Sequence, residues 1–334
     1  MDAVWLAKLT ERGMLRPSFV PPSPIRRLRD YTRLRVDLTR DRVRQYQRLE
    51  KLLEDALIKV SSVASGIDTL SVRDMLEALI GGERDPQVLA GLARGRMKAK
   101  RAELVEALTG RFDDHHGELA RILLDSIDAL TGQIDTLTTR IEDLLAAMPA
   151  AVGDPDRHDG DPGRHDGGGG LPVLERLAEI PGLGVRGAQI IVAEIGLDMT
   201  RFRDPGRLAS WAKLTPRTIQ SGAMLRGGKT GKGNPYLKGV LGEAAAAAAK
   251  TQTFLGDRYR RIVKRRGKLK ALVAVARSIL VTVWHLLADP TDRFHDLGVD
   301  YHANRIDKDR KIRNHLRQLQ ALGYTVTLNP IAAA

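Results

Sequence analysis

The chain has 334 residues, 43% of them hydrophobic, with 54 lysine and arginine residues against 41 aspartate and glutamate residues and no cysteine. This length accommodates two or three domains and the apolar content suffices for a core, which excludes wholesale disorder, while the lack of cysteine excludes disulfides, cysteine-ligated metals and cysteine catalysis. The net charge of +13 favours a polyanionic partner, nucleic acid first, and an aromatic content of 4% argues against base stacking as the main mode of binding.

The N-terminal segment carries no signal peptide, because residues 1–6 lack a basic start and a long apolar stretch. No segment has the roughly 20 consecutive apolar residues that span a bilayer. We therefore expect a cytoplasmic protein without a membrane partner. Clustered prolines predict a loop over 15–22.

A long helix is expected from Pro24 to about Val60, with Ser23 as its N-cap. Apolar residues recur there at helical spacing: Val43, Tyr46, Leu49, Leu53, Leu57 and Val60. The other face is rich in arginine: Arg26, Arg27, Arg29, Arg33, Arg35, Arg40, Arg42, Arg44 and Arg48. Two interpretations stay open for this face, a solvated surface or a contact with phosphates.

Residues 70–110 are expected to form two or three short helices, interrupted at Gly81 and Gly82. Residues 114–147 then carry a heptad repeat: Leu123, Ile127, Leu130, Ile134, Leu137, Ile141 and Leu144. The repeat predicts a coiled coil or a helical hairpin, which packs either against the 40–60 helix or against a second copy of the chain. His115, His116 and His285 have no partners at ligand spacing, so we expect them to be structural or exposed.

Residues 153–170 (GDPDRHDGDPGRHDGGGG) read as a flexible linker and a domain boundary, because nothing apolar is present to bury. Two RHDG copies place His158 and His165 in this linker. A metal site there is the alternative, but nothing in such a segment fixes the geometry of the ligands.

Residues 171–290 are expected to form a compact helical domain. Its first motif, residues 174–191, is an apolar helix that ends in Pro-Gly-Leu-Gly and is followed at once by a second helix, the helix-hairpin-helix pattern. Gly182, Gly184 and Arg186 would then contact a nucleic-acid backbone at the start of the second helix. The alternative is an ordinary tight turn between helices.

The second motif, residues 214–238, is expected to be a glycine-rich basic loop followed by a helix. A nucleotide-binding P-loop is excluded, because Ala223 stands where that motif needs glycine. Ser221 lies on a flexible turn among cations that suit a phosphate: Arg217, Arg226, Lys229, Lys232 and Lys238. A serine hydroxyl can attack a DNA phosphate while such cations neutralise the developing charge. The alternative is a simple Ser-Gly turn.

The last part of the domain combines a basic and an apolar segment. An alanine-rich helix over 242–250 is followed by a basic stretch in which Arg260, Arg261, Lys264 and Arg265 are expected to bind a nucleic-acid backbone. Residues 271–287 form an apolar helix with Trp284 in the core. A basic tail over 291–334 contains a helix near 307–322, and 324–328 is a short strand or extended chain.

These motifs, in this order, resemble the insertion-sequence 110 family of bacterial transposases. The resemblance rests on residues 2–7 (DAVWLA), 16–22 (RPSFVPP), 27–55, 180–184 (IPGLG), 214–217 (LTPR), 220–222 (QSG) and 232–235 (KGNP). It covers nearly the whole chain except the glycine linker and parts of 61–115.

The resemblance implies a recombinase with two functional parts. In the family a RuvC-like domain with four acidic residues binds a divalent metal, Mg²⁺ in the complete protein, and the C-terminal part carries a serine that corresponds to Ser221. The family cuts and exchanges DNA strands with a composite site, is guided by a structured RNA, and forms dimers or tetramers through a coiled coil. The partners implied are therefore the DNA of element ends and target, a guide RNA and further copies of the chain.

The chain departs from the family pattern at its start. Asp2 resembles the fourth acidic residue, so the first three would lie before Met1, and a single aspartate does not hold Mg²⁺. This predicts impaired or absent recombination, with Asp2 and Ser221 as the catalytic residues that remain and Asp2 as the metal ligand. The alternative function is a non-catalytic nucleic-acid-binding protein, a decayed or domesticated transposase fragment; a helix-hairpin-helix repair or junction-binding protein leaves residues 220–222 unexplained.

The expected fold is mainly α and has five parts. They are a remnant of a RuvC-like domain with a basic helix (1–60), a helical coiled-coil region (61–150), a Gly/Asp-rich linker (151–170), a compact helical transposase domain with the helix-hairpin-helix and the serine (171–290), and a basic tail (291–334).

Overall fold

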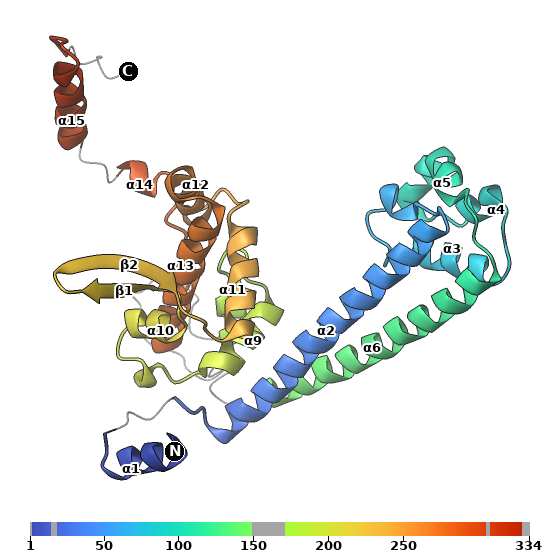
Figure 1. The fold of residues 1–334 in the computed structure, drawn as a ribbon, viewed down its shortest axis with the longest axis horizontal. Helices are drawn as coiled ribbons and strands as arrows, with labels where there is room; N and C mark the ends of the chain where they lie inside the picture. The colour runs from blue at the N-terminus through green and yellow to red at the C-terminus, as the bar shows by residue number, and fades with distance from the viewer. Residues whose placement is uncertain (1, 15–18, 149–170, 305–307, 329–334) are drawn as a thin grey trace, which may run out of the picture. The chain divides into compact units, whose positions relative to one another are not determined.

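The computed structural model describes residues 2–14, 19–148, 171–304 and 308–328, which are mainly helical as expected (Figure 1). The chain divides into two compact units. The first comprises Met1–Pro149 with Ala193–Ile195, and the second comprises Ala150–Val192 with Gly196–Ala334. The expected linker at 153–170, with His158 and His165, lies outside the described residues.

The first unit is built around a hairpin of two long helices, α2 (Ser23–Asp55) and α6 (Asp114–Ala146), which lie side by side (Figure 1). Ile127, Ile134 and Ile141 of the heptad repeat are buried, and the four leucines of the repeat are partly buried. The repeat therefore packs within the chain against α2, which is one of the two arrangements that the sequence allowed.

Both ends of α2 differ from the expectation. Pro22 occupies the N-cap position and makes no side-chain capping bond, so Ser23 is already helical and is not the cap. The helix ends at Asp55 rather than near Val60, because the backbone then turns away: the carbonyl of Ala56 accepts from Arg111 N at 2.7 Å, and Leu57 has φ of 61°. Val60 instead begins the short 3-10 turn η1 (Val60–Ser62).

Residues 70–110 contain three short helices, within the expected number, and these helices cover one end of the long hairpin (Figure 1). They are α3 (Leu70–Ile80), α4 (Pro86–Gly91) and α5 (Arg101–Leu108), with a 3-10 turn η2 (Gly95–Lys100) before α5. The break falls at Gly81 and Gly82, where Gly82 has φ of 96°. Their apolar faces share one buried core with Leu49 and Leu53 of α2 and with Leu124 of α6.

The N-terminal segment forms a helix that the sequence analysis did not predict, α1 (Asp2–Glu11). Its Val4, Trp5 and Leu6 side chains are largely exposed. Residues 19–22 are irregular, as the clustered prolines predict, and 15–18 lie outside the described residues.

The second unit is a helical cluster around α13 (Lys268–Ala288). The helices α8 (Val173–Ala178), α10 (Pro205–Trp211), α11 (Pro235–Ala248) and α12 (Phe254–Arg266) all pack against α13. The helix α9 (Val185–Ile195) follows α8, and a 3-10 turn η3 (Met199–Arg201) precedes α10. Small side chains on α11 allow close packing, since Ala244, Ala245 and Ala248 are buried.

Among the described residues, α13 is the one helix that is long and apolar enough to cross a membrane by length and composition. Arg277 interrupts its apolar residues, so it is not the run of about 20 consecutive apolar residues that the sequence analysis looked for. Within the second unit, Val275, Ile279 and Val283 are buried against neighbouring helices, which is the position of a core helix.

The segment expected to be a loop, 216–230, forms a two-stranded antiparallel hairpin, β1 (Pro216–Ser221) and β2 (Met224–Thr230). Its paired residues include Ile219 with Arg226 and Ser221 with Met224. These residue types favour the hairpin, because Thr218 and Ile219 prefer an extended backbone and Gly222 permits a tight turn. Farther on, α14 (Tyr301–Asn304) and α15 (Lys308–Ala321) follow, and 324–328 is irregular rather than a strand.

Candidate catalytic and nucleic-acid-binding site

Ser221 lies at the tip of the β1–β2 hairpin. Only Gly222 and Ala223 connect it to Met224, and Gly222 has φ of 57°, which suits the first central position of a type II′ turn. The Ser221 side chain is exposed. A defined hairpin turn, rather than a flexible loop, therefore presents its hydroxyl group to solvent.

Arg226 is the expected cation that the hairpin brings nearest to Ser221 in register. Alternate residues of a strand share a face, so the pairs Ser221–Met224 and Ile219–Arg226 project from the same side. Diagonal neighbours on one face are about 7–8 Å apart, within reach of an arginine side chain. Lys229 is exposed but lies where the register shifts, between the Thr218–Gly227 and Pro216–Thr230 pairs.

Arg217 and Lys238 meet at the base of the hairpin. Lys238 Nζ donates to the carbonyl of Gly231 at 3.1 Å. The Arg217 guanidinium covers Gly231 so closely that a Cβ there would lie 2.7 Å from its terminal nitrogen. Lys238 thus ties the residue after β2 to α11, and Arg217 of β1 lies beside the same residue, whereas Lys232 is exposed.

The two glycines of the turn between α8 and α9 have different surroundings, one packed against α11 and the other open to solvent. Gly182 has φ of 86°, and a Cβ there would lie 2.3 Å from the Ala244 carbonyl of α11. Gly184 is the N-cap of α9 and has open space around it. Gly184 and Arg186 are exposed at the start of α9, where unbonded N–H groups can meet an anion, whereas Gly182 serves the packing of the turn.

The side chains Arg176 and Glu179 fix this turn, and sequence analysis missed both. Arg176 is buried and donates from Nη1 to the carbonyls of Leu286, Asp289 and Asp292 at 3.0, 3.2 and 2.9 Å. Burial lowers the pKa of Arg176. The signal available was the charged pair Glu175 and Arg176 inside a short helix whose other residues are apolar.

Glu179 accepts hydrogen bonds from the Arg293 guanidinium and from Phe294 N, the latter at 3.2 Å. The hydrogen bond from Arg293 is the main cause that lowers the pKa of Glu179. The carboxylate thus ties the end of α8 to the segment that follows α13.

Of the four basic residues expected to bind nucleic acid on α12, one makes hydrogen bonds within the protein and three are exposed. Arg260 donates to the Thr251 carbonyl at 3.1 Å and to Gln252. Arg261, Lys264 and Arg265 are exposed. They are available to a polyanion along the second half of the helix.

Asp2, the expected metal ligand, is the first residue of α1, and its side chain lies outside the described residues. The other acid of α1, Glu11, is nine residues farther along, which is about 13 Å at 1.5 Å per helical residue. At this separation along one helix, these two residues cannot share a metal ion. Asp2 belongs to the first unit and Ser221 to the second.

Asp113, His115 and His116 do have ligand atoms within 4.8 Å of one another, so the expectation that these histidines lack such partners was wrong. Both Nδ1 atoms face Asp113 Oδ1, at 2.6 Å from His115 and 2.5 Å from His116. Asp113 and His116 also form the capping box of α6. Helix capping accounts for this group without a metal.

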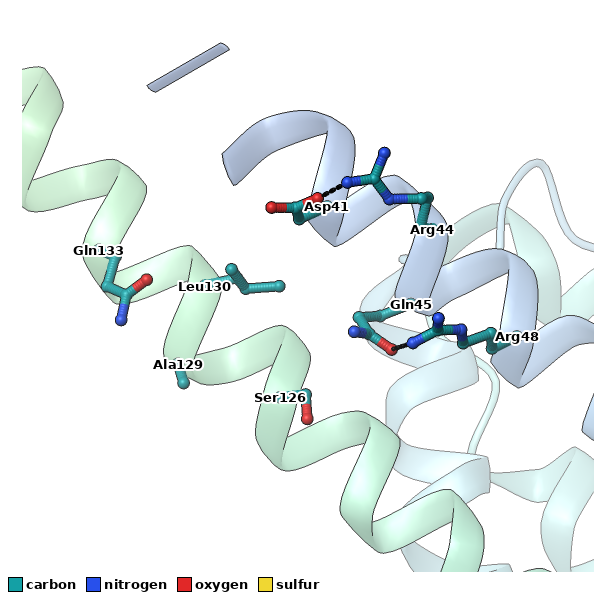
Figure 2. A pocket seen from close by; sticks show the side chains of 8 residues that line it. All are labelled: Asp41, Arg44, Gln45, Arg48, Ser126, Ala129, Leu130 and Gln133. Atoms are coloured by element: carbon teal, nitrogen blue, oxygen red, sulfur yellow. Dashed lines mark hydrogen bonds and ion pairs between the residues drawn. The ribbon is translucent and has the colours of Figure 1, made fainter. Parts of the chain in front are cut away.

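The arginine-rich face of α2 is largely paired along its own helix near α6. Figure 2 shows a groove between α2 and α6, about 460 Å³ in volume, in which Arg44 pairs with Asp41 and Arg48 bonds to Gln45. Arg40 pairs with Asp37 at 3.1 Å, and Arg42 donates to Thr131 of α6 at 3.2 Å. These contacts favour the solvated interpretation for this part of the face.

Comparison with known proteins gives two family matches and one relative. A family model described as "Transposase IS116/IS110/IS902 family" matches residues 174–260, and a model described as "Transposase", of the DEDD and IS110 type, matches residues 1–58. An uncharacterized 43.6 kDa protein of the insertion element IS110 from Streptomyces coelicolor is 32% identical over 123 residues, which is 36% of this chain and 30% of that protein. The C-terminal match contains α8, α9, the β1–β2 hairpin and α11, and the DEDD type suggests use of a divalent metal. Residues 1–58 and 174–260 of the chain are thus similar to transposases of the IS110 family.

Proposed function

We propose that this chain acts in the transposition of an insertion sequence, with Ser221 as the nucleophile that cleaves a DNA strand. The observation that carries the proposal is the presentation of Ser221: an exposed hydroxyl at a two-residue hairpin turn, with Arg226 on the same face. A hairpin exposed on both faces can enter a DNA groove, and its arginine can neutralise the charge of the attacked phosphate.

The atom balance of the cleavage step requires only the serine, the DNA phosphate and a proton transfer through solvent. The Ser221 oxygen attacks phosphorus and forms a phosphoserine ester, one P–O ester bond of the DNA breaks, and a deoxyribose hydroxyl leaves. The serine proton passes through solvent to the leaving oxygen. Reversal of this exchange with the hydroxyl of another strand completes strand transfer.

Binding to the DNA backbone falls to surfaces outside the hairpin. Gly184 and Arg186 offer N–H groups and a cation at the start of α9, and Arg261, Lys264 and Arg265 extend along α12. We further propose a guide RNA, a homo-oligomer, Mg²⁺ as the divalent metal of the complete family protein, and a cytoplasmic location, in line with the family resemblance.

The test is a denaturing gel of the protein with labelled DNA that spans the genomic locus encoding the chain. Cleavage through Ser221 predicts a covalent protein–DNA band that Ser221→Ala abolishes while DNA binding persists. Ser210→Ala removes an exposed hydroxyl from α10 and serves as the matched control. An adduct that survives Ser221→Ala contradicts the assignment.

The second candidate is a nucleic-acid-binding protein without catalytic activity. It is favoured by one observation: no described residue hydrogen-bonds to the Ser221 hydroxyl, so no general base is in place beside it. Salt-sensitive binding to DNA without any covalent adduct would support this candidate.

A further inference from the structure

The two helices α12 and α13 carry a charge imbalance that the fold does not compensate. Together they contain nine lysine and arginine residues and a single acid, Asp257, and α13 contains no acid at all. Cations in the last turn of α12 suit the helix dipole, but those farther from its end gain nothing from it. Arg258 and Arg261 of α12 are of this second kind, and Arg277 lies near the middle of α13.

The tight connection between α12 and α13 places two of these arginines, Arg258 and Arg277, at similar distances along the helices from the turn. Only Gly267, with φ of 79°, separates α12 from α13, and the two helices pack against each other. Arg258 precedes Gly267 by nine residues and Arg277 follows it by ten, which places both about 14–15 Å from the turn at 1.5 Å per residue. Arg258 and Arg261 are three residues apart and share a helix face.

Arg258 has a guanidinium that the fold leaves without a partner. Its Nε is buried and has no hydrogen-bond partner, and no described carboxylate pairs with it. Burial lowers the pKa of Arg258, and the charges of Arg277 and Arg261 lower it further. A buried donor and three neighbouring like charges cost free energy, and an anion at this point would remove both costs.

We propose that Arg258, Arg261 and Arg277 form a clamp for one phosphate group of a nucleic-acid backbone. Guanidinium groups donate in a fixed fork that matches phosphate oxygens, and a partly buried site strengthens these bonds relative to exposed lysines. Exposed Lys264 and Arg265 continue from the clamp toward Gly267, so successive phosphates of one strand have further cations to follow. The assignment of the phosphate to nucleic acid rests on the proposed function.

The test measures binding of the full chain to labelled duplex DNA and labelled RNA by fluorescence anisotropy over a salt series. Arg258→Gln and Arg277→Gln are each expected to weaken binding roughly tenfold, as for a lost charge-assisted hydrogen bond, and to reduce the salt slope by about one. Arg207→Gln, in α10, is the matched control: it removes the same charge from an exposed arginine that already pairs with Asp204 at 3.2 Å. It is expected to change affinity less than twofold.

Thermal unfolding in chloride buffer, with and without inorganic phosphate, supplies a readout that a structural arginine would not give. Arg258→Gln is expected to raise the unfolding temperature without phosphate, because it removes an unpartnered donor and relieves repulsion. Inorganic phosphate is expected to stabilise the wild-type protein and not this variant. If Arg258→Gln lowers the unfolding temperature and phosphate has no effect, Arg258 is structural and the clamp is refuted.

The remaining outcomes separate the clamp from the proposed function. Equal nucleic-acid binding by wild type and both clamp variants refutes the clamp and leaves the function standing. If phosphate stabilises the wild type only, yet nucleic-acid binding is unchanged in the variants, the site takes free phosphate and the backbone assignment is wrong. Absence of nucleic-acid binding by the wild type refutes the proposed function, and with it the backbone assignment of the clamp.

Discussion

Replacement of Gly182 by alanine distinguishes a packing role from a binding role in the turn between α8 and α9. Gly182 has φ of 86°, and an added Cβ would lie 2.3 Å from the Ala244 carbonyl oxygen and 2.7 Å from Ala248 N. Both atoms belong to the backbone of the C-terminal half of α11, so neither can rotate away. Either the turn or α11 must shift.

The cost has three contributions. The left-handed conformation costs a non-glycine residue about 1–2 kcal/mol, and forcing a methyl group into packed backbone costs about 1–3 kcal/mol. The smaller entropy of the unfolded alanine chain returns about 0.4–1 kcal/mol. Gly182→Ala should therefore destabilise the second unit by about 1–5 kcal/mol and lower its unfolding temperature by roughly 2–20 °C.

Gly184→Ala is the matched control, since Gly184 has φ of −90° and no atom within 4 Å of an added Cβ. It should change the free energy of unfolding by less than about 1 kcal/mol. Urea unfolding followed by circular dichroism measures both variants. Equal losses for the two, or a loss below about 1 kcal/mol for Gly182→Ala, would refute the packing of this turn against α11.

Three further predictions concern the interior and the acid response of the fold. Arg176→Met leaves the carbonyls of Leu286, Asp289 and Asp292 without their donor and should cost about 2–4 kcal/mol in urea unfolding; a loss under about 1 kcal/mol would mean that water replaces the guanidinium. Ile134→Ala in the α2–α6 seam should cost about 2–5 kcal/mol by the same measurement, whereas Ile122→Ala, at a side chain that is 62% exposed, should stay within about 0.5 kcal/mol. Hydrogen bonds from Arg121 and then Arg73 lower the pKa of Glu77 in the folded state. The stabilisation that Glu77 contributes is therefore present above the ordinary carboxyl pKa and is lost as the pH falls through the lowered value. Glu77→Gln should flatten the decline in unfolding temperature on acidification, and an unchanged profile would contradict the ion pairs.

The periodic spacing of apolar residues predicted the long helices, in which buried side chains recur at regular intervals. The heptad of α6 indicated a helix with one apolar seam, and Ile127, Ile134 and Ile141 are buried in that seam. The same reasoning extended α2 too far. Ala56, Ile58 and Val60 are buried in the same core although the helix has ended, so the apolar pattern continues through a turn that backbone bonds to the 107–111 segment impose.

The candidate site was only partly accessible to sequence reasoning. Ser221 and its neighbouring cations were named from their chemistry, but the hairpin was not, because its glycines and lysines suggested a loop. The alternation Thr218, Ile219, Gln220 before Ser-Gly was the overlooked signal. Arg258 and Arg277 carry no local signature, since their proximity depends on how α12 folds back at Gly267.

The β1–β2 hairpin has consequences for the behaviour of the protein before it meets DNA. It is a two-stranded sheet with all six residues of β1 exposed, and Met224 and Leu225 at its turn are 72% and 67% exposed. Open strand edges with apolar tips recruit strands of other molecules and so promote aggregation. Arg217, Arg226 and Lys229 give each copy of the hairpin the same sign of charge. Electrostatic repulsion thus keeps free copies of the hairpin apart in solution, and a polyanion that screens this charge also covers the surface that would otherwise self-associate.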